Sequence, residues 1–99
     1  MSIKNRDVRK LIEEGLGNAG RLKILRALAS GETISQTKYG LQKVTGLSSI
    51  YVRKHLKILV DTGWVNKYDY SPQVYTLNLD NPKARFLVDF FKNVGYLQA

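Results

Sequence analysis

The segment 46–65, GLSSIYVRKHLKILVDTGWV, carries the side chains best suited to bind a polyanion. Its leucines and valines recur at the spacing of a buried helix face, and its cations fall on the other side. Guanidinium and ammonium groups pair with phosphate oxygens and with the edges of bases. A helix that packs on one side and offers cations on the other is typical of a nucleic-acid reader.

Three cations in this segment have separate expected roles. Arg53 is the leading candidate for a base contact, because a guanidinium pairs bidentately with guanine O6 and N7. Lys54 and Lys57 are expected to contact backbone phosphates. Loss of Arg53 should therefore relax specificity at one base pair, whereas loss of Lys57 should weaken binding to all sequences alike.

The sequence predicts less specific roles for the other residues of the segment. Ser48 and Ser49 are both helix-cap candidates and can donate to phosphates or bases. Tyr51 can reach a thymine methyl group or a phosphate. Ile50 lies off the apolar stripe and either packs on the preceding helix, which we favour, or meets a thymine methyl. His55 lies beside the stripe, and a packed or hydrogen-bonded structural role is favoured over a phosphate contact.

Start, stop and alternation signals predict the elements that position this segment. The chain is expected to be mostly α-helical with a small β-hairpin (α+β), and to form a single domain over residues 1–99. The predicted elements are an N-terminal helix over 3–14, a helix over 18–30, an extended piece over 32–34, a helix ending near 45, the helix of the opening segment, strands over 64–68 and 74–79 joined by a turn over 69–73, and a last helix over 81–97.

Caps and glycines set the predicted boundaries. Asn18 is expected to cap the second helix, Ser35 or Thr37 the third, and Asp80 or Asn81 the last. Glycines should end the first helix near residue 15 and the fourth at residue 63.

Inside the third helix, Leu41 and Val44 are expected to face inward. Gly40 either permits a close helix contact or is simply tolerated, at about 1 kcal/mol relative to alanine.

Two further sets of polar side chains are expected to reach DNA. The third helix would lie across the groove, and the tip of the hairpin would reach the flanking backbone or minor groove. Tyr68 and Tyr70 either reach DNA or cover the hairpin's own face, with neither alternative favoured. The two sets are Gln36, Lys38, Gln42 and Lys43 on the third helix, and Lys67, Tyr68, Tyr70 and Gln73 on the hairpin.

The last helix carries more apolar surface than a single buried side needs. Part of that surface is expected to meet a second copy of the chain, in preference to a helix sunk in its own core. The predicted dimer-interface residues are Leu11, Phe86, Leu87, Phe90, Phe91, Val94 and Leu97.

Composition excludes several other classes of function. The 99 residues hold 16 Lys and Arg against 8 Asp and Glu, a net charge of +8, which favours an anionic partner. The absence of cysteine and the single histidine leave no metal site or disulfide framework, and no catalytic constellation is found, so no cofactor and no enzyme activity are expected. No apolar run is long enough to span a bilayer, and the N-terminus lacks a signal-peptide pattern, so a cytoplasmic, nucleoid-associated protein is expected.

Two stretches resemble those of known repressors. Residues 18–29, NAGRLKILRALA, resemble the second-helix motif of ArsR-type repressors. The opening segment is similar to their recognition-helix motif, here Gly46-Leu47-Ser48, Val52, His55-Leu56, Leu59 and Gly63-Trp64-Val65. The resemblance covers residues 18–79, is shared in part by MarR-like and PadR-like proteins, and would suit a small archaeal, plasmid or viral member.

The resemblance implies a winged helix-turn-helix with an additional N-terminal helix and a C-terminal dimerisation helix. Such a protein would bind double-stranded DNA sequence-specifically as a homodimer and act as a transcriptional regulator, most simply a repressor. Its recognition helix would enter the major groove. The alternative is a protein that coats or bridges DNA in plasmid segregation or chromatin organisation. The missing cysteines, and a last helix whose one potential ligand is Asp89, depart from the metal-sensing members.

Overall fold

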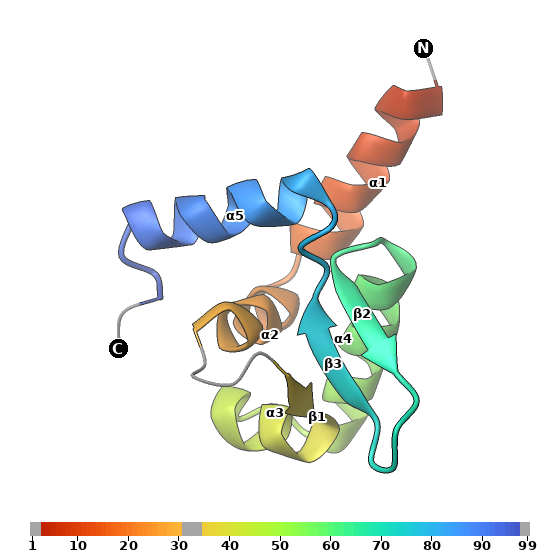
Figure 1. The fold of residues 1–99 in the computed structure, drawn as a ribbon, viewed down its shortest axis with the longest axis vertical. Coiled ribbons are helices and arrows are strands. Elements are labelled where there is room, and N and C mark those ends of the chain that lie inside the picture. The colour runs from red at the N-terminus through yellow and green to blue at the C-terminus, as the bar shows by residue number, and fades with distance from the viewer. Residues whose placement is uncertain (1–2, 31–34, 98–99) are drawn as a thin grey trace.

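A computed structural model describes residues 3–30 and 35–97, with side chains described from residue 9 onward. The order of elements confirms the predicted α+β winged helix (Figure 1). The elements are α1 (Ile3–Leu16), α2 (Ala19–Ser30), β1 (Gln36–Thr37), α3 (Lys38–Thr45), α4 (Ser49–Asp61), β2 (Val65–Tyr68), β3 (Val74–Leu77) and α5 (Pro82–Asn93).

The sheet has three antiparallel strands in the order β1-β3-β2. The β2–β3 hairpin was predicted, and it pairs Val65 with Leu77 and Tyr68 with Val74. The short strand β1 adds to its other edge by pairing Gln36 with Tyr75. The extended piece predicted over 32–34 lies outside the described residues, and the strand observed is four residues later.

The core lies where α2 meets α4, α3 and the sheet. Ile24 and Leu25 of α2 have no exposed surface, and neither does Leu41 of α3. Burial of side chains of this size contributes roughly 1.5–3 kcal/mol each. The other fully buried large side chains are Val52, Leu56, Leu59, Trp64 and Val65. The apolar stripe of α4 is therefore anchored in the centre of the molecule.

Caps begin the helices where the sequence predicted them. The side-chain oxygens of Asn18 and Asn81 each accept a hydrogen bond from the backbone N–H two residues ahead, at 2.8 and 3.1 Å. The Thr37 hydroxyl accepts from the N–H three residues ahead, at 3.0 Å. Each bond satisfies a donor that the first turn of a helix leaves free.

The first helix was predicted to stop at Gly15, but it continues to Leu16. A Cβ at Gly15 would collide with the indole ring of Trp64. The same ring donates a hydrogen bond from Nε1 to the Leu11 carbonyl oxygen, at 2.7 Å. The glycine thus permits the close approach of the residue that follows α4, and it is tolerated inside the helix for that reason.

The prediction that Val44 faces inward is wrong. Leu41 is fully buried, but the Val44 side chain is 63% exposed. It lines an open hollow between α2, the end of α3 and Leu97. A Cβ at Gly40 would meet the flexible end of the Gln36 side chain. This glycine therefore does not serve a close contact with another helix.

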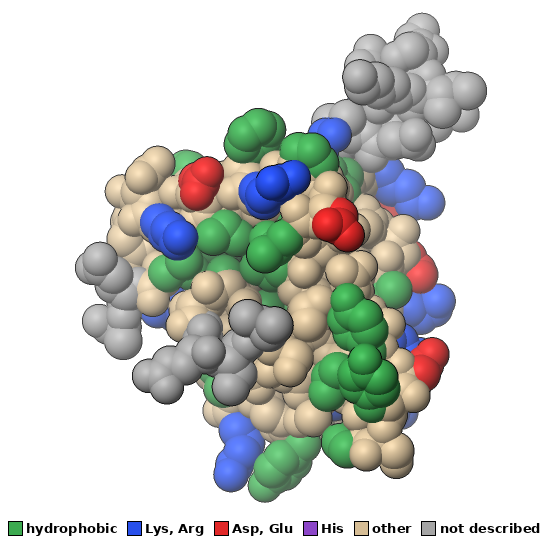
Figure 2. All heavy atoms as spheres, in the orientation of Figure 1, with side chains coloured by type: hydrophobic (Ala, Val, Ile, Leu, Met, Phe, Trp, Pro, Cys, Tyr) green, Lys and Arg blue, Asp and Glu red, His purple; other side chains and the backbone are tan. Residues whose placement is uncertain are grey.

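Helix α5 lies at the upper left of the molecule in Figure 1, and its residues form two apolar sides. The inner side holds Ala84 and Phe91, both buried, with Leu87 half-buried between them. We call Phe86, Phe90 and Val94 the outer ridge of α5; they are spaced every four residues, Val94 being the C-cap residue just after the helix, and are 70, 58 and 59% exposed. Figure 2 shows hydrophobic side chains along this part of the surface. The helix ends at Asn93, four residues before the predicted end.

The turn after α5 is tied back to α2. Arg26 Nε donates to the Tyr96 carbonyl oxygen at 2.7 Å, and its guanidinium lies 5.0 Å from the centre of the Tyr96 ring. That ring in turn packs edge-on against Phe91, with centroids 4.8 Å apart. These contacts fix the orientation of α5 on the domain.

Candidate nucleic-acid interface

The turn that leads into α4 is closed by backbone and side-chain hydrogen bonds. Gly46 ends α3 with φ +76°, a left-handed conformation that suits glycine, and its N–H donates to the Gln42 carbonyl oxygen at 2.9 Å. Two residues later, the Ser48 hydroxyl oxygen accepts from the Tyr51 N–H at 3.4 Å. This is the short connection of a helix-turn-helix, and it sets the direction in which α4 leaves the domain.

Helix α4 buries the predicted stripe and exposes the opposite side. Val52, Leu56 and Leu59 are at most 1% exposed. Ile50, by contrast, is 71% exposed, so the prediction that it packs on the preceding helix is wrong. It comes two residues before Val52, which at 3.6 residues per turn places it on the far side of the helix. Tyr51, 55% exposed, lies beside it.

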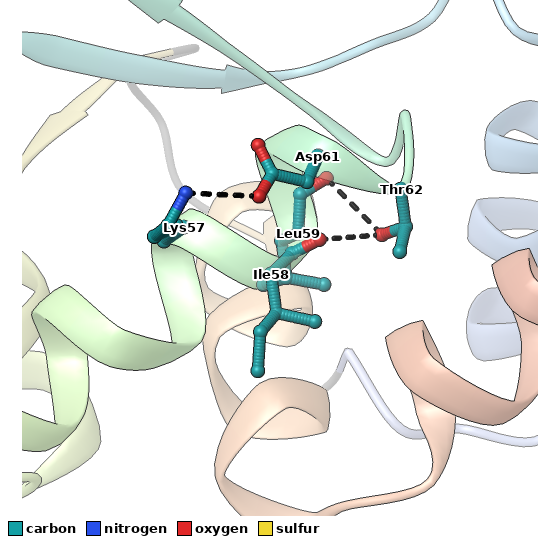
Figure 3. Close-up of polar contacts among 5 residues, drawn as sticks. All are labelled: Lys57, Ile58, Leu59, Asp61 and Thr62. Carbon is teal, nitrogen blue, oxygen red and sulfur yellow. Dashed lines mark hydrogen bonds and ion pairs between the residues drawn. The ribbon is translucent and has the colours of Figure 1, made fainter.

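The outermost line of α4 is a ridge spaced by four, three and four residues. We call Ile50, Lys54, Lys57 and Asp61 the outer ridge of α4. Lys57 Nζ lies 3.1 Å from Asp61 Oδ2 (Figure 3), and both side chains are largely exposed, at 78 and 59%. A pair of this kind contributes only about 0.3–0.5 kcal/mol. The ammonium group is therefore easily released to another anion.

His55 is the packed, hydrogen-bonded residue that was favoured from the sequence. It is 7% exposed, and its Nδ1 lies 3.2 Å from Arg21 Nη1 of α2. Because a guanidinium only donates, Nδ1 must accept and the imidazole proton must be on Nε2. Burial, with the nearby charges of Arg21 and Lys54, lowers the pKa of His55. The ring also stacks on Tyr51 of the exposed side, with centroids 6.2 Å apart.

The hairpin carries a polar, aromatic tip beside α4. Lys67 Nζ lies 3.7 Å from Asp69 Oδ1, and Gln73 Nε2 donates to the same carboxylate oxygen at 3.0 Å. Tyr68 and Tyr70 stack on each other with centroids 5.9 Å apart and remain 40 and 67% exposed. The two rings thus form a flat aromatic surface on the outside of the hairpin.

The predicted polar residues around α3 differ in their exposure. Lys43 is exposed, with its ammonium group 5.2 Å from the centre of the Tyr39 ring. Lys38 and Gln42 are half-buried. Gln36 is also half-buried and belongs to strand β1, not to the helix. Of this set, Lys43 is the exposed member, and Gln36 is part of the sheet.

A cavity of about 300 Å³ lies between α4, the start of α3 and the sheet. We call it the wing-side cavity, and its lining residues are Lys38, Arg53, Leu56, Lys57, Val60, Asp61, Lys67 and Tyr75. Burial, and then the Asp69 carboxylate, raise the pKa of Tyr75, which keeps its hydroxyl a donor. The sequence predicted the four cations as separate contacts, and nothing in it signalled that Asp61 and Tyr75 would join them.

The predicted dimer-interface residues do not form one surface. Leu11 and Phe91 are 7 and 4% exposed and belong to the core of the chain itself. Leu87 and Leu97 are half-buried and pack against that core. The outer ridge of α5 is what remains accessible. Leu11 and Phe91 were misassigned because the sequence does not show which side of a doubly apolar helix its own domain covers.

The described side chains form no cluster suited to a metal ion. In residues 9–30 and 35–97, no three His, Asp or Glu side chains gather closely enough to hold one. No helix in residues 3–30 and 35–97 is long and apolar enough to cross a membrane.

Comparison with solved structures finds winged-helix proteins over nearly the whole chain. HlyU from Vibrio cholerae is similar at a TM-score of 0.77 and 22% identity, covering 95% of this chain and 97% of its own. The transcriptional repressor BigR from Xylella fastidiosa is similar at 0.71 and 20% identity, covering 95 and 96%. The homodimeric winged helix-turn-helix DNA-binding domain Mb0332 from Mycobacterium bovis, a possible ArsR-family regulator, is similar at 0.74 and 21% identity, covering 96 and 87%.

These similarities establish the fold and no more than the fold. No protein-family model matches the sequence, and no curated protein sequence matches it.

Proposed function

We propose that this chain binds double-stranded DNA as a homodimer and regulates transcription, acting as a repressor in the cytoplasm. The observation that carries the proposal is α4, which is anchored by a fully buried stripe and presents Lys54, Lys57 and Arg53 outward beside an exposed hairpin. This is the arrangement that places a recognition helix in the major groove and a wing on the flanking backbone. The chain acts by binding, without catalysis.

The charge of the whole chain supports a polyanionic partner. The net charge of +8 creates a positive potential that attracts DNA and raises the rate of encounter. Sequence would be read by the N-terminal half of α4, which meets base edges in this docking mode. Phosphate contacts would come from the remaining predicted set on α3, α4 and the hairpin, with Ser49, Lys43 and Lys67 among its exposed members.

The structural neighbours support the same kind of function. BigR is described as a transcriptional repressor, and Mb0332 as a homodimeric DNA-binding domain. Our chain covers 96% of the solved BigR chain and 87% of the solved Mb0332 fragment, which comprises residues 1–100 of that protein.

The dimer would form through the outer ridge of α5. Phe86, Phe90 and Val94 expose large apolar side chains on one line of a helix whose other side is already packed. A contiguous apolar surface of this kind is costly to leave in water and is self-complementary across a two-fold axis. Two copies related in this way would place their α4 helices in successive major grooves, about 34 Å apart.

Selection of bound fragments from a genomic pool, followed by a footprint, tests the proposal. We expect a bounded footprint over a pseudo-palindrome with half-site centres about 10 base pairs apart. A footprint that spreads as protein concentration rises would contradict a repressor and indicate a coating protein. Failure to recover any fragment at micromolar protein would contradict DNA binding altogether.

A further inference from the structure

The wing-side cavity is lined by four cations, twice as many as the hollow between α2, α3 and Leu97. Lys57 and Arg53 reach it from α4, Lys38 from the first turn of α3, and Lys67 from β2. Asp61 is the one carboxylate in its lining. Cations that converge from three elements repel one another, and the fold holds them together without enough acidic partners. Such a concavity attracts an anion.

Two of these cations are already paired and two are not. Lys57 is paired with Asp61 at 3.1 Å, and Lys67 with Asp69 at 3.7 Å. Arg53 and Lys38 make no ion pair in the part of the chain that the structure describes. Their donors are therefore the ones available to an incoming anion at once. Release of Lys57 from Asp61 would make a third cation available.

The size and lining of the cavity match a phosphate group. A volume of about 300 Å³ accommodates a phosphate and several waters, since a water molecule occupies roughly 30 Å³ in the liquid. Leu56 and Val60 are apolar residues of its lining, and apolar surroundings strengthen the attraction between the cations and a bound anion. The planar guanidinium of Arg53 can hold two phosphate oxygens at once.

The position of Arg53 on α4 also points away from the bases. The outer ridge of α4 is the line farthest from the buried stripe, and its N-terminal members are Ile50 and Lys54. Arg53 lies between that ridge and the stripe, on the flank that faces Lys67 and Tyr75 of the sheet. A side chain on this flank meets the wall of the groove, where the backbone runs, before it meets the base edges.

We propose that the wing-side cavity is the seat for one phosphodiester of the DNA backbone, with Arg53 as its main donor and Asp61 as the carboxylate that the phosphate displaces from Lys57. This proposal rests on the proposed function. It changes the role expected of Arg53 from reading a base to holding the backbone. It leaves Ile50 and Lys54 as the residues of the outer ridge that face the base pairs.

Three variants on the selected duplex test the proposal across a range of salt concentrations. For each copy of the dimer, Arg53→Ala should weaken binding about tenfold for every sequence and reduce the slope of log K against log salt by about 1, which makes about 2 for the dimer. Lys54→Ala is the matched control, a neighbouring exposed cation on the outer ridge of α4, and should change the preference at one base pair. Asp61→Asn should tighten binding about twofold for each copy of the dimer, or about three- to fivefold in all, for all sequences, by about the worth of one exposed ion pair per copy.

Replacement of single phosphates by neutral methylphosphonates locates the seat. One position should weaken binding of the wild-type chain and have little further effect on Arg53→Ala, because both changes remove the same contact. Inorganic phosphate alone should show no saturable binding to the protein at micromolar concentrations. A saturable site there would mean that the cavity takes the free ion in place of the duplex.

Two results would overturn the seat while leaving DNA binding intact. One is an Arg53→Ala variant that loses preference at a single base pair with an unchanged salt slope, as expected of a base reader. The other is full additivity between Arg53→Ala and every methylphosphonate, together with an unchanged affinity for Asp61→Asn. A wild-type chain that binds no duplex at all would instead contradict the proposed function.

Discussion

At the scale of single residues, the contact between Arg21 and His55 links the core to the exposed side of α4. His55 accepts from a cation on one side and stacks on the exposed ring of Tyr51 on the other. Arg21 Nε is buried and has no hydrogen-bond partner, so hydrogen bonds do not fully compensate the cost of burying this guanidinium. A second positive charge on His55 would therefore be poorly tolerated.

The lowered pKa of His55 predicts a specific loss of stability in acid. An unfolded chain takes up this proton near the ordinary value of 6.5, whereas the folded chain takes it up at a lower pH. The unfolded state thus binds more protons in between, and the free energy of unfolding falls as the pH falls through 6.5. Urea unfolding of the wild-type chain between pH 7.5 and 5 measures this loss.

His55→Asn is the matched variant for that measurement. Its side-chain oxygen can still accept from Arg21, but it cannot take up a proton in this range. We expect its free energy of unfolding to depend less on pH than that of the wild-type chain. Parallel curves for the two proteins would show that His55 is not the group responsible.

At the scale of elements, the short-range signals were readable and the long-range ones were not. The caps Asn18, Thr37 and Asn81 act within three residues of themselves, so the sequence was sufficient to find them. Gly15 looked like a helix stop because the ring that it accommodates lies 49 residues further on, at Trp64. Strand β1 exists only through its pairing with β3, and two residues carry no alternation to detect.

The residues of the candidate site fall into the same two groups, those predictable from local spacing and those that depend on long-range packing. The exposed cations of α4 follow from helical spacing alone, and so does its buried stripe. The meeting of Arg53 with Lys38 and Lys67 around one cavity depends on how α3 and the hairpin dock against α4. Ile50 was misplaced because an apolar residue was assumed to need a packed neighbour.

The outer ridge of α5 makes a prediction at the level of one element. Phe90→Glu should convert a dimer into a monomer, because it places a charge in the centre of an apolar interface. The stability of the single chain should change little, since Phe90 is 58% exposed. Light scattering at tens of micromolar gives the mass, and Asp89→Ala, an exposed change on the same helix, is the control. A monomeric wild-type chain would contradict the proposed dimer.

At the scale of the whole molecule, α5 and the candidate DNA-binding elements lie at different ends of the fold. In Figure 1, α5 lies in the upper part of the molecule, whereas α3 and the tip of the β2–β3 hairpin lie in the lower part. Arg26 of α2 holds the turn over 94–97 through Tyr96. This contact fixes the position of α5 relative to α2, and therefore relative to α4. A dimer formed through α5 would therefore present two copies of the candidate DNA-binding elements at a defined spacing.

The dependence of DNA affinity on salt tests the central claim most directly. The wild-type chain should be titrated with its selected duplex from about 50 to 200 mM salt, where each phosphate contact contributes a slope of about 0.9 in log K against log salt. A dimer that uses several cations per copy should lose about a hundredfold or more in affinity over this range. An affinity that stays flat, or no binding at micromolar protein, would contradict the account.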